Sequence, residues 1–266
     1  MQTIREIKNW LDTEYPAALA EEWDNIGLLV GDETKTVRRI MTCLTVTPNT
    51  CNEAVTEKID LIVSHHPFPF RAVKRITSET VEGRMLLQLI GADIGVYSPH
   101  TAHDSAPDGV NRQLATLLEL TDVEPLNENG SGRIGNLKES ITFHNLLGMI
   151  RDRLGSCAYV GDVRRKIRRI AVGCGAADEF VDQAARSGAD LLLLGEARFH
   201  TCLQAESLGL ALALPGHYAS ERFAVETLAE KIAARFPDLE CFAGRSEYDV
   251  VRREDSHPRA GGEPDE

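Results

Sequence analysis

The sequence lacks several features that mark special classes of protein. No apolar run approaches the length that crosses a membrane, and the first residues, MQTIREIKNW, lack the layout of a secretory signal peptide. The six cysteines include no C-x-x-C pair and stand mostly among apolar residues, as buried thiols do in a reducing compartment. A Walker-type phosphate loop is also missing. These absences predict a cytoplasmic protein with no membrane association and no disulfide framework.

The sequence also has fewer basic than acidic residues. Lys and Arg number 29 against 41 Asp and Glu, which gives a net charge of −12 and disfavours a general nucleic-acid-binding role. The chain has 266 residues, of which 42% are hydrophobic, so it can build one large or two modest domains with proper cores.

Short apolar runs alternate with helical patterns along most of the chain, which predicts an α/β fold. Strands are expected at residues 28–30, 39–47, 61–64, 94–97, 167–173, 191–194, 210–214 and 240–242. Helices are expected at residues 4–15, 48–58, 80–92, 110–120, 178–187, 199–207 and from about 217 to 236. A polar, Gly- and Asn-rich stretch over 121–140 predicts a linker. We therefore expect a first α/β half over 1–125, a second over 126–250, and a disordered polar tail over 251–266.

One stretch, DLIVSHHPFPF at residues 60–70, places two histidines directly after a predicted buried strand. Inside a strand, His65 and His66 would point to opposite faces, but beyond its end both side chains can turn toward one site. The carboxyl ends of strands are where open α/β sheets bind their ligands. A pair of hydrogen-bonded loop histidines is the alternative interpretation.

An internal repeat connects these histidines with the second half of the chain. Residues 40–66 align without a gap on residues 170–196, so that His65-His66 falls on Gly195-Glu196. Further along, SPHTAHD aligns on PGHYASE, which pairs His100 with His217 and Asp104 with Glu221. Both matches occur in the same order, which indicates a duplicated strand–helix unit.

If the two halves face each other, their strand ends meet at one cleft. The cleft would collect His65, His66, His100, Asp104, Glu196, His217 and Glu221. Imidazoles and carboxylates without a thiolate suit zinc, manganese, iron or cobalt. The set exceeds what one ion needs, so we expect a dinuclear centre with a bridging carboxylate and with His65 and His66 on different ions. Taken singly, each residue could instead be a helix cap or a core histidine.

The chain resembles the Nif-three-like proteins, also called GTP cyclohydrolase 1 type 2 homologs. The resemblance rests on WDNIGLLVGD, DLIVSHHPFPF, HTAHD, LLLLGEARFH and GHYASE, in this order, and covers roughly residues 1–250. It implies duplicated α/β halves facing each other across a dinuclear metal cleft, in a chain that assembles into hexameric rings. The implied metal ligands are His65, His66, Asp104, His217 and Glu221, and His100 and Glu196 would either contact these ligands or face the substrate. Thr45 stands where many members carry an Asp, so one carboxylate beside the ligands is in doubt.

The predicted function is that of a metal-dependent hydrolase acting on a small molecule, a nucleotide-like heterocycle. Two divalent ions would activate a water, and the resemblance implies attack on C8 of the guanine ring of GTP. His100 or Glu196 would transfer protons. The alternative is a non-catalytic protein that stores, delivers or senses metal, or a regulatory scaffold. The basic run Arg164–Arg169 could hold a triphosphate or could simply be a solvated charged face.

Overall fold

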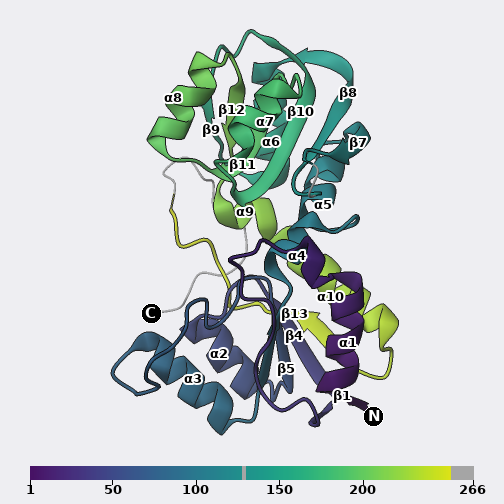
Figure 1. The fold of residues 1–266 in the computed structure, drawn as a ribbon, viewed down its shortest axis with the longest axis vertical. Coiled ribbons are helices and arrows are strands. Elements are labelled where there is room, and N and C mark those ends of the chain that lie inside the picture. Colours follow the sequence, from purple (N-terminus) through teal and green to yellow (C-terminus); the bar gives the residue numbers. More distant parts are fainter. Residues whose placement is uncertain (128–129, 253–266) are drawn as a thin grey trace.

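The computed structural model describes residues 1–127 and 130–252, and it contains two mixed α/β halves (Figure 1). Of the predicted polar tail, residues 253–266 lie outside the described residues. Figure 1 shows the sheet of the first half in one lobe and the sheet of the second half in the other, with α4 (His100–Ser105) and α9 (His217–Glu221) between them. No helix in the described ranges is long and apolar enough to cross a membrane.

The first half is built on a five-stranded sheet with the order β13-β4-β5-β6-β2. Its strands are β2 (Gly27–Val30), β4 (Arg39–Cys43), β5 (Leu61–Ser64), β6 (Gly95–Ser98) and β13 (Glu240–Ala243). Helices α2 (Pro48–Thr56) and α3 (Val81–Gly91) cover one face, and α1 (Ile4–Glu14) and α10 (Phe223–Arg235) cover the other. A small ladder of β1 (Gln2–Thr3) and β3 (Thr36–Val37) and the short helix η1 (Ala17–Leu19) complete this half.

The second half is built on a six-stranded sheet with the order β7-β8-β10-β11-β12-β9. Its strands are β7 (Thr121–Pro125), β8 (Arg133–Thr142), β9 (Ala158–Val160), β10 (Lys166–Ala176), β11 (Leu191–Glu196) and β12 (Ala211–Leu214). Helices α5 (Val110–Leu117) and α6 (Phe143–Leu154) cover one face, and α7 (Phe180–Arg186) and α8 (Phe199–Ser207) cover the other. The sheets are therefore buried on both faces, as the unbroken apolar strands predict.

The two halves repeat the same local arrangement. Ile40 of β4 lies opposite Leu61 of β5, and Ile170 of β10 lies opposite Leu191 of β11, so the gapless alignment is matched by the strand register. Asp60 accepts hydrogen bonds from the backbone N–H groups of residues 38 and 39, and Asp190 accepts the equivalent bonds from residues 168 and 169. The same carboxylate thus fixes the start of the central strand pair in each half.

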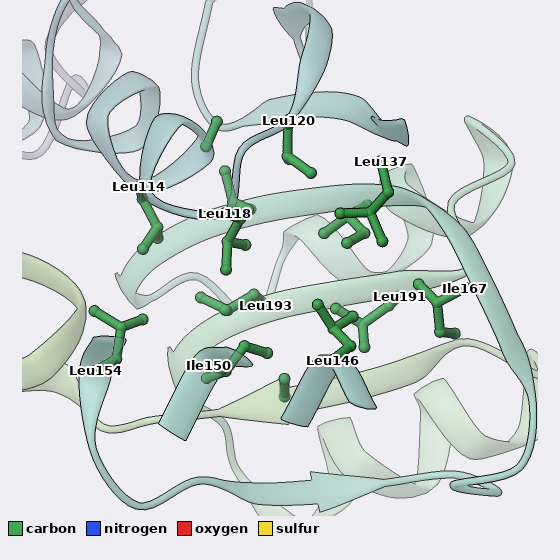
Figure 2. Packing of buried hydrophobic residues seen from close by; sticks show 14 of the residues in the cluster. Leu114, Leu118, Leu120, Leu137, Leu146, Ile150, Leu154, Ile167, Leu191 and Leu193 are labelled. Atoms are coloured by element: carbon green, nitrogen blue, oxygen red, sulfur yellow. The ribbon is translucent and has the colours of Figure 1, made fainter. Parts of the chain in front are cut away.

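The two halves also exchange their last helices. Although α5 comes at the end of the first half in sequence, its Leu114, like Leu118 directly after the helix, is fully buried against Leu191 and Leu193 of the second sheet (Figure 2). In return α10, which follows the second half, packs on the first sheet, where Ile232 is fully buried. Each core therefore depends on a helix supplied by the other half.

The predicted linker over 121–140 is wrong. These residues form β7 and most of β8, an antiparallel pair at the edge of the second sheet. Polar residues suit an edge pair because its outer positions face solvent, and the composition alone resembles that of a loop. The predicted strand at 240–242 forms as β13, but it pairs with β4 of the first sheet. The sheets therefore do not divide at a single point after residue 125.

Candidate metal site between the two halves

His65 and His66 continue the backbone pairing of β5 just beyond its end. Their N–H groups donate to the carbonyls of Cys43 and Leu44, each at 2.8 Å, and Ser98 Oγ donates to the carbonyl of His65 at 2.6 Å. Both imidazoles turn toward the junction of the halves, with ring centroids 5.1 Å apart. The strand end therefore presents the two rings side by side.

Glu221 lies at the centre of the cluster. Its Oε2 is 3.1 Å from Nε2 of His66 and 3.1 Å from Nε2 of His217. The same oxygen is 4.0 Å from Nε2 of His65. His217 and Glu221 are four residues apart on α9, which places both on one face of the helix. One carboxylate oxygen of the second half therefore faces imidazoles from both halves.

Asp104 lies on the other side of His65. Its Oδ1 is 3.5 Å from Nε2 of His65 and accepts a hydrogen bond from Cys174 Sγ at 3.1 Å. Burial, together with the charge of Glu221, raises the pKa of Asp104 to about 7. Burial alone would also raise the pKa of Glu221, but hydrogen bonds from His217 and His66 hold it well below its usual range. Glu221 is therefore ionised near neutral pH, whereas Asp104 is divided between its neutral and its ionised form.

Each outer histidine is fixed through its Nδ1. Asp24 Oδ1 lies 2.8 Å from Nδ1 of His100, and Glu196 Oε1 lies 3.0 Å from Nδ1 of His217. Burial would lower the pKa of His217, but its bonds to Glu221 and Glu196 raise it to about 9. Thr45 Oγ1 holds Nδ1 of His66 at 2.7 Å. A partner on Nδ1 sets the orientation of the ring and leaves Nε2 for the centre, as is usual for metal-binding histidines.

The residues present fit a metal ion. His65 is buried, and neither of its ring nitrogens makes a hydrogen bond among the described residues, since Asp104 stands too far away at 3.5 Å. An unpaired buried polar group is costly, and a metal ion would satisfy it. Two groups have donor atoms within 4.8 Å of one another, namely His65–His66–His100 and His66–His217–Glu221. The cluster can therefore bind a metal.

All seven residues singled out in the sequence lie at this junction, but their positions differ. His65, His66, His217, Glu221 and Asp104 lie around the centre. His100 stands beside them, with its ring 5.4 Å from that of His65 and 5.6 Å from that of His66. Glu196 reaches the cluster only through His217, and more than half of its side chain is exposed.

Two carboxylates were not predicted to take part. Asp24 holds His100; a turn accounts for Asn25 and Gly27 nearby, but not for Asp24, which alone is weak evidence of a site. Glu247 accepts hydrogen bonds from the backbone N–H groups of Leu44 at 2.9 Å and Thr45 at 2.7 Å, and it pairs with Arg222. A buried carboxylate from the far end of the chain therefore fixes the backbone at Thr45. No local pattern around Glu247 indicates this contact.

The Gly-Cys-Gly segment at residues 173–175, where the pairing of β10 with β11 is irregular, has a steric role. Gly175 has a positive φ of +59°, and a Cβ there would lie 2.2 Å from Oε1 of Glu221. Gly195 is equally close-packed, because a Cβ would lie 2.5 Å from both the Gly175 carbonyl and Ser220 Oγ. Gly175 therefore leaves room for the Glu221 carboxylate, and Gly195 lets Gly175 and Ser220 pack closely beside it, so both glycines have a structural role.

A cavity of about 730 Å³ opens beside the cluster, and its walls include His66, His100, Asp104, His217 and Glu221. A second cavity, of about 480 Å³, reaches His66 and His217 from another side. The basic run does not contribute to the first cavity among the described residues. Instead Arg164, Arg165 and Arg169 pair with Asp162, Asp190 and Glu124, which agrees with a solvated charged face.

The fold and the cluster define a mixed α/β protein with a His/Glu site that could hold a metal ion. The chain belongs to the Duf34/NIF3 (NGG1p interacting factor 3) family, whose model matches residues 2–248. The family expected from the motifs is thereby confirmed.

Relatives and solved structures agree with this assignment. A GTP cyclohydrolase 1 type 2 homolog from Clostridium perfringens is 32% identical over 255 residues, covering 92% of this chain and 97% of the relative. Reduced HcgD from Methanocaldococcus jannaschii has a similar structure, with a TM-score of 0.81 and 30% identity over 91% of this chain and 97% of that one. Protein SA1388 from Staphylococcus aureus superposes with a TM-score of 0.88 at 25% identity, covering 95% of this chain and 99% of that one.

Proposed function

We propose that the chain is a metal-dependent hydrolase with two divalent ions, zinc, manganese or iron, at the junction of its halves. His66, His217 and Glu221 would hold one ion, and His65, Asp104 and Glu221 the other. The observation that carries the proposal is the position of Glu221 Oε2, 3.1 Å from His66 and His217 and 4.0 Å from His65. A carboxylate so placed suits a bridge between two ions.

The substrate would be a nitrogen heterocycle, as the name of the curated relatives suggests. Divalent ions supply a hydroxide at neutral pH by lowering the pKa of bound water. His100 lines the large cavity, and Asp24 holds its Nδ1 at 2.8 Å, so its ring is oriented for proton transfer to or from a substrate there. Glu196 would act through His217, whose orientation it fixes. The buried walls around Glu221 would keep bulk water from the reacting atoms.

A non-catalytic role in metal storage or delivery is the second candidate. It is favoured by the second cavity, because His66 and His217 line both cavities and could pass an ion between them. This candidate predicts the same metal ligands but no turnover.

Turnover measured by mass spectrometry separates the two candidates. Protein reconstituted with zinc, manganese or iron is incubated with GTP, guanosine and other nucleosides and nucleotides, and formate and ring-opened products are measured. His66→Ala should abolish the product and cost the ion that His66, His217 and Glu221 would hold. His144→Ala is the matched control, because His144 is exposed and lies outside both cavities. Absence of product with every metal and substrate, from protein shown to hold its ions, would leave metal storage or delivery as the function.

A further inference from the structure

The large cavity has an aromatic corner next to the metal cluster. Trp23 and Phe70 are 64% and 49% exposed, and their ring centroids lie 6.3 Å apart. Each ring also stands edge-on to His100, at 6.0 Å and 6.2 Å. Large apolar rings are exposed in this way where a ligand covers them, and flat rings best accommodate a flat ligand.

This corner is held in place by polar contacts. Asn25 Nδ2 donates to the carbonyl of Pro69 at 3.0 Å, which ties the loop of Trp23 to the loop of Phe70. Asp24 is completely shielded from solvent and accepts hydrogen bonds from the N–H and hydroxyl of Thr101 as well as contacting His100. The rings are therefore presented by a fixed frame, which lowers the entropy lost when a ligand binds.

The charge on the cavity walls is of one sign apart from the histidines. Beyond the cluster itself, the walls carry the carboxyl groups of Glu21, Glu82 and Glu179. Among the described residues that line this cavity there is neither a lysine nor an arginine. Carboxylates accept hydrogen bonds from ring N–H and exocyclic amino groups, whereas they repel phosphate groups.

We infer that this cavity takes a planar nitrogen heterocycle without phosphate groups, a free nucleobase or a nucleoside. The inference rests on the proposed hydrolase function for the reaction and adds the class of substrate. The ring stacks on Trp23 and Phe70 within reach of His100, and its N–H groups face the glutamates. A cavity of about 730 Å³ is within the ordinary size of sites for such molecules. A triphosphate would bring about four negative charges to walls whose described lining residues include no basic side chain, so only the proposed metal ions could offset them.

Tryptophan fluorescence gives a test that does not depend on turnover. The chain has two tryptophans, Trp10 and Trp23, so Trp10→Phe leaves Trp23 as the only emitter. Metal-loaded Trp10→Phe protein is titrated with guanosine, adenosine, GTP and ATP, and calorimetry on the unaltered protein checks the affinities. We expect at least one nucleoside to quench Trp23 saturably and to bind about tenfold or more tightly than its triphosphate.

Two sets of variants sharpen the result. Trp23→Leu and Phe70→Leu should each weaken nucleoside binding, measured by calorimetry, while metal content stays unchanged. Glu82→Gln combined with Glu179→Gln should improve triphosphate binding and so narrow the gap between nucleoside and triphosphate. Equal or tighter binding of the triphosphate in the unaltered chain, or nucleoside binding that ignores Trp23 and Phe70, would overturn the inference.

The outcomes keep this inference separate from the proposed function. Turnover of GTP combined with weak guanosine binding overturns the phosphate-free ligand and supports the hydrolase. Guanosine binding without turnover of any heterocycle supports the ligand class and overturns the hydrolase. Failure of both nucleosides to bind overturns the inference whatever the turnover result.

Discussion

The first and the second half share the same local arrangement of strands and helices but carry different side chains at the ends of their strands. Where β5 is followed by the imidazoles of His65 and His66, β11 ends with Gly195 and the carboxylate of Glu196. Both α4 and α9 begin with a histidine whose Nδ1 is held by a carboxylate, but that carboxylate is Asp24 in one half and Glu196 in the other. Across the junction, the histidine pair of the first half faces the carboxylate of Glu221 in the second half.

Packing explains why the halves are not interchangeable. Position 195 admits no side chain, because a Cβ there would meet the Gly175 carbonyl and Ser220 Oγ at 2.5 Å. The equivalent position in the first half holds the buried imidazole of His65. Gly175 leaves room for Glu221, and Gly195 lets Gly175 and Ser220 approach β11 closely, so the carboxylate of the second half can reach the histidines of the first.

The sharpest test of this division is to neutralise the equivalent carboxyls, Glu221 and Asp104, one at a time. Glu221→Gln should weaken binding of both ions by more than about 100-fold, because one oxygen faces His65, His66 and His217. Asp104→Asn should cost one ion per chain and leave the other. Metal content after dialysis and calorimetric titration measure both effects. Similar losses in the two variants would contradict a central role for Glu221.

The exchanged helices predict that the halves unfold together. Leu114→Ala and Ile232→Ala each remove a fully buried side chain and should cost about 2–5 kcal/mol of unfolding free energy. In urea, both variants should shift Trp10 fluorescence and far-ultraviolet circular dichroism by the same amount, although Leu114 lies in the second core and Trp10 packs in the first. A variant that moves one of the two probes alone would show that the halves are independent.

Acid sensitivity should come from the first half. Burial lowers the pKa of His103 from 6.5 to about 4, while Ser220 occupies the equivalent place on α9. The unfolded chain takes up a proton on His103 as the pH falls below about 6.5, whereas the folded chain resists it, so stability is lost as the pH falls. His103 should account for roughly 2 kcal/mol lost between about pH 7.5 and pH 5.

Urea unfolding at the two pH values checks this expectation. His103→Gln removes the titrating group, so the variant should lose less stability than the unaltered chain over the same interval. An identical loss in both proteins would place the acid-sensitive group elsewhere.

The smallest effect is expected where the halves are most alike. Asp60→Asn and Asp190→Asn each weaken two hydrogen bonds to the backbone at the start of the central strand pair. Each should cost about 1 kcal/mol, and the two costs should be nearly equal. Chemical denaturation of the paired variants measures them. Unequal losses of unfolding free energy would show that these hydrogen bonds contribute differently in the two halves, although the strand register is the same.

Local pattern was enough to predict most elements and the cluster. The strand at 61–64 and the helix at 199–207 have the predicted bounds, because each is a short apolar or amphipathic run between clear turns. Helix α6 and strand β9 were not anticipated, and the β7–β8 pair was taken for a linker because its residues are polar. The exchange of α5 and α10 between the halves could not be predicted from the sequence either. An apolar helix face indicates that the helix covers a sheet, but it does not indicate which of the two sheets.

The site shows the same limit. The histidines and acids at strand ends were found through the repeat, which carries their order in the chain. Asp24 and Glu247 act through contacts with residues 76 and about 200 positions away, and such contacts leave no local signal. The aromatic corner was missed for the same reason, since Trp23 and Phe70 meet only in the folded chain.

The exchange of helices has a consequence for the origin of the molecule. A single half made as a separate polypeptide would leave the sheet face that receives the other half's helix uncovered, and a second copy could fill it in the same manner. Two such copies would form a domain-swapped homodimer with the metal cluster on its twofold axis. When the two copies are joined in one polypeptide, their sequences can differ, so the two halves need not be symmetric. One copy could then specialise in imidazoles and the other in carboxylates, which a symmetric dimer could not do.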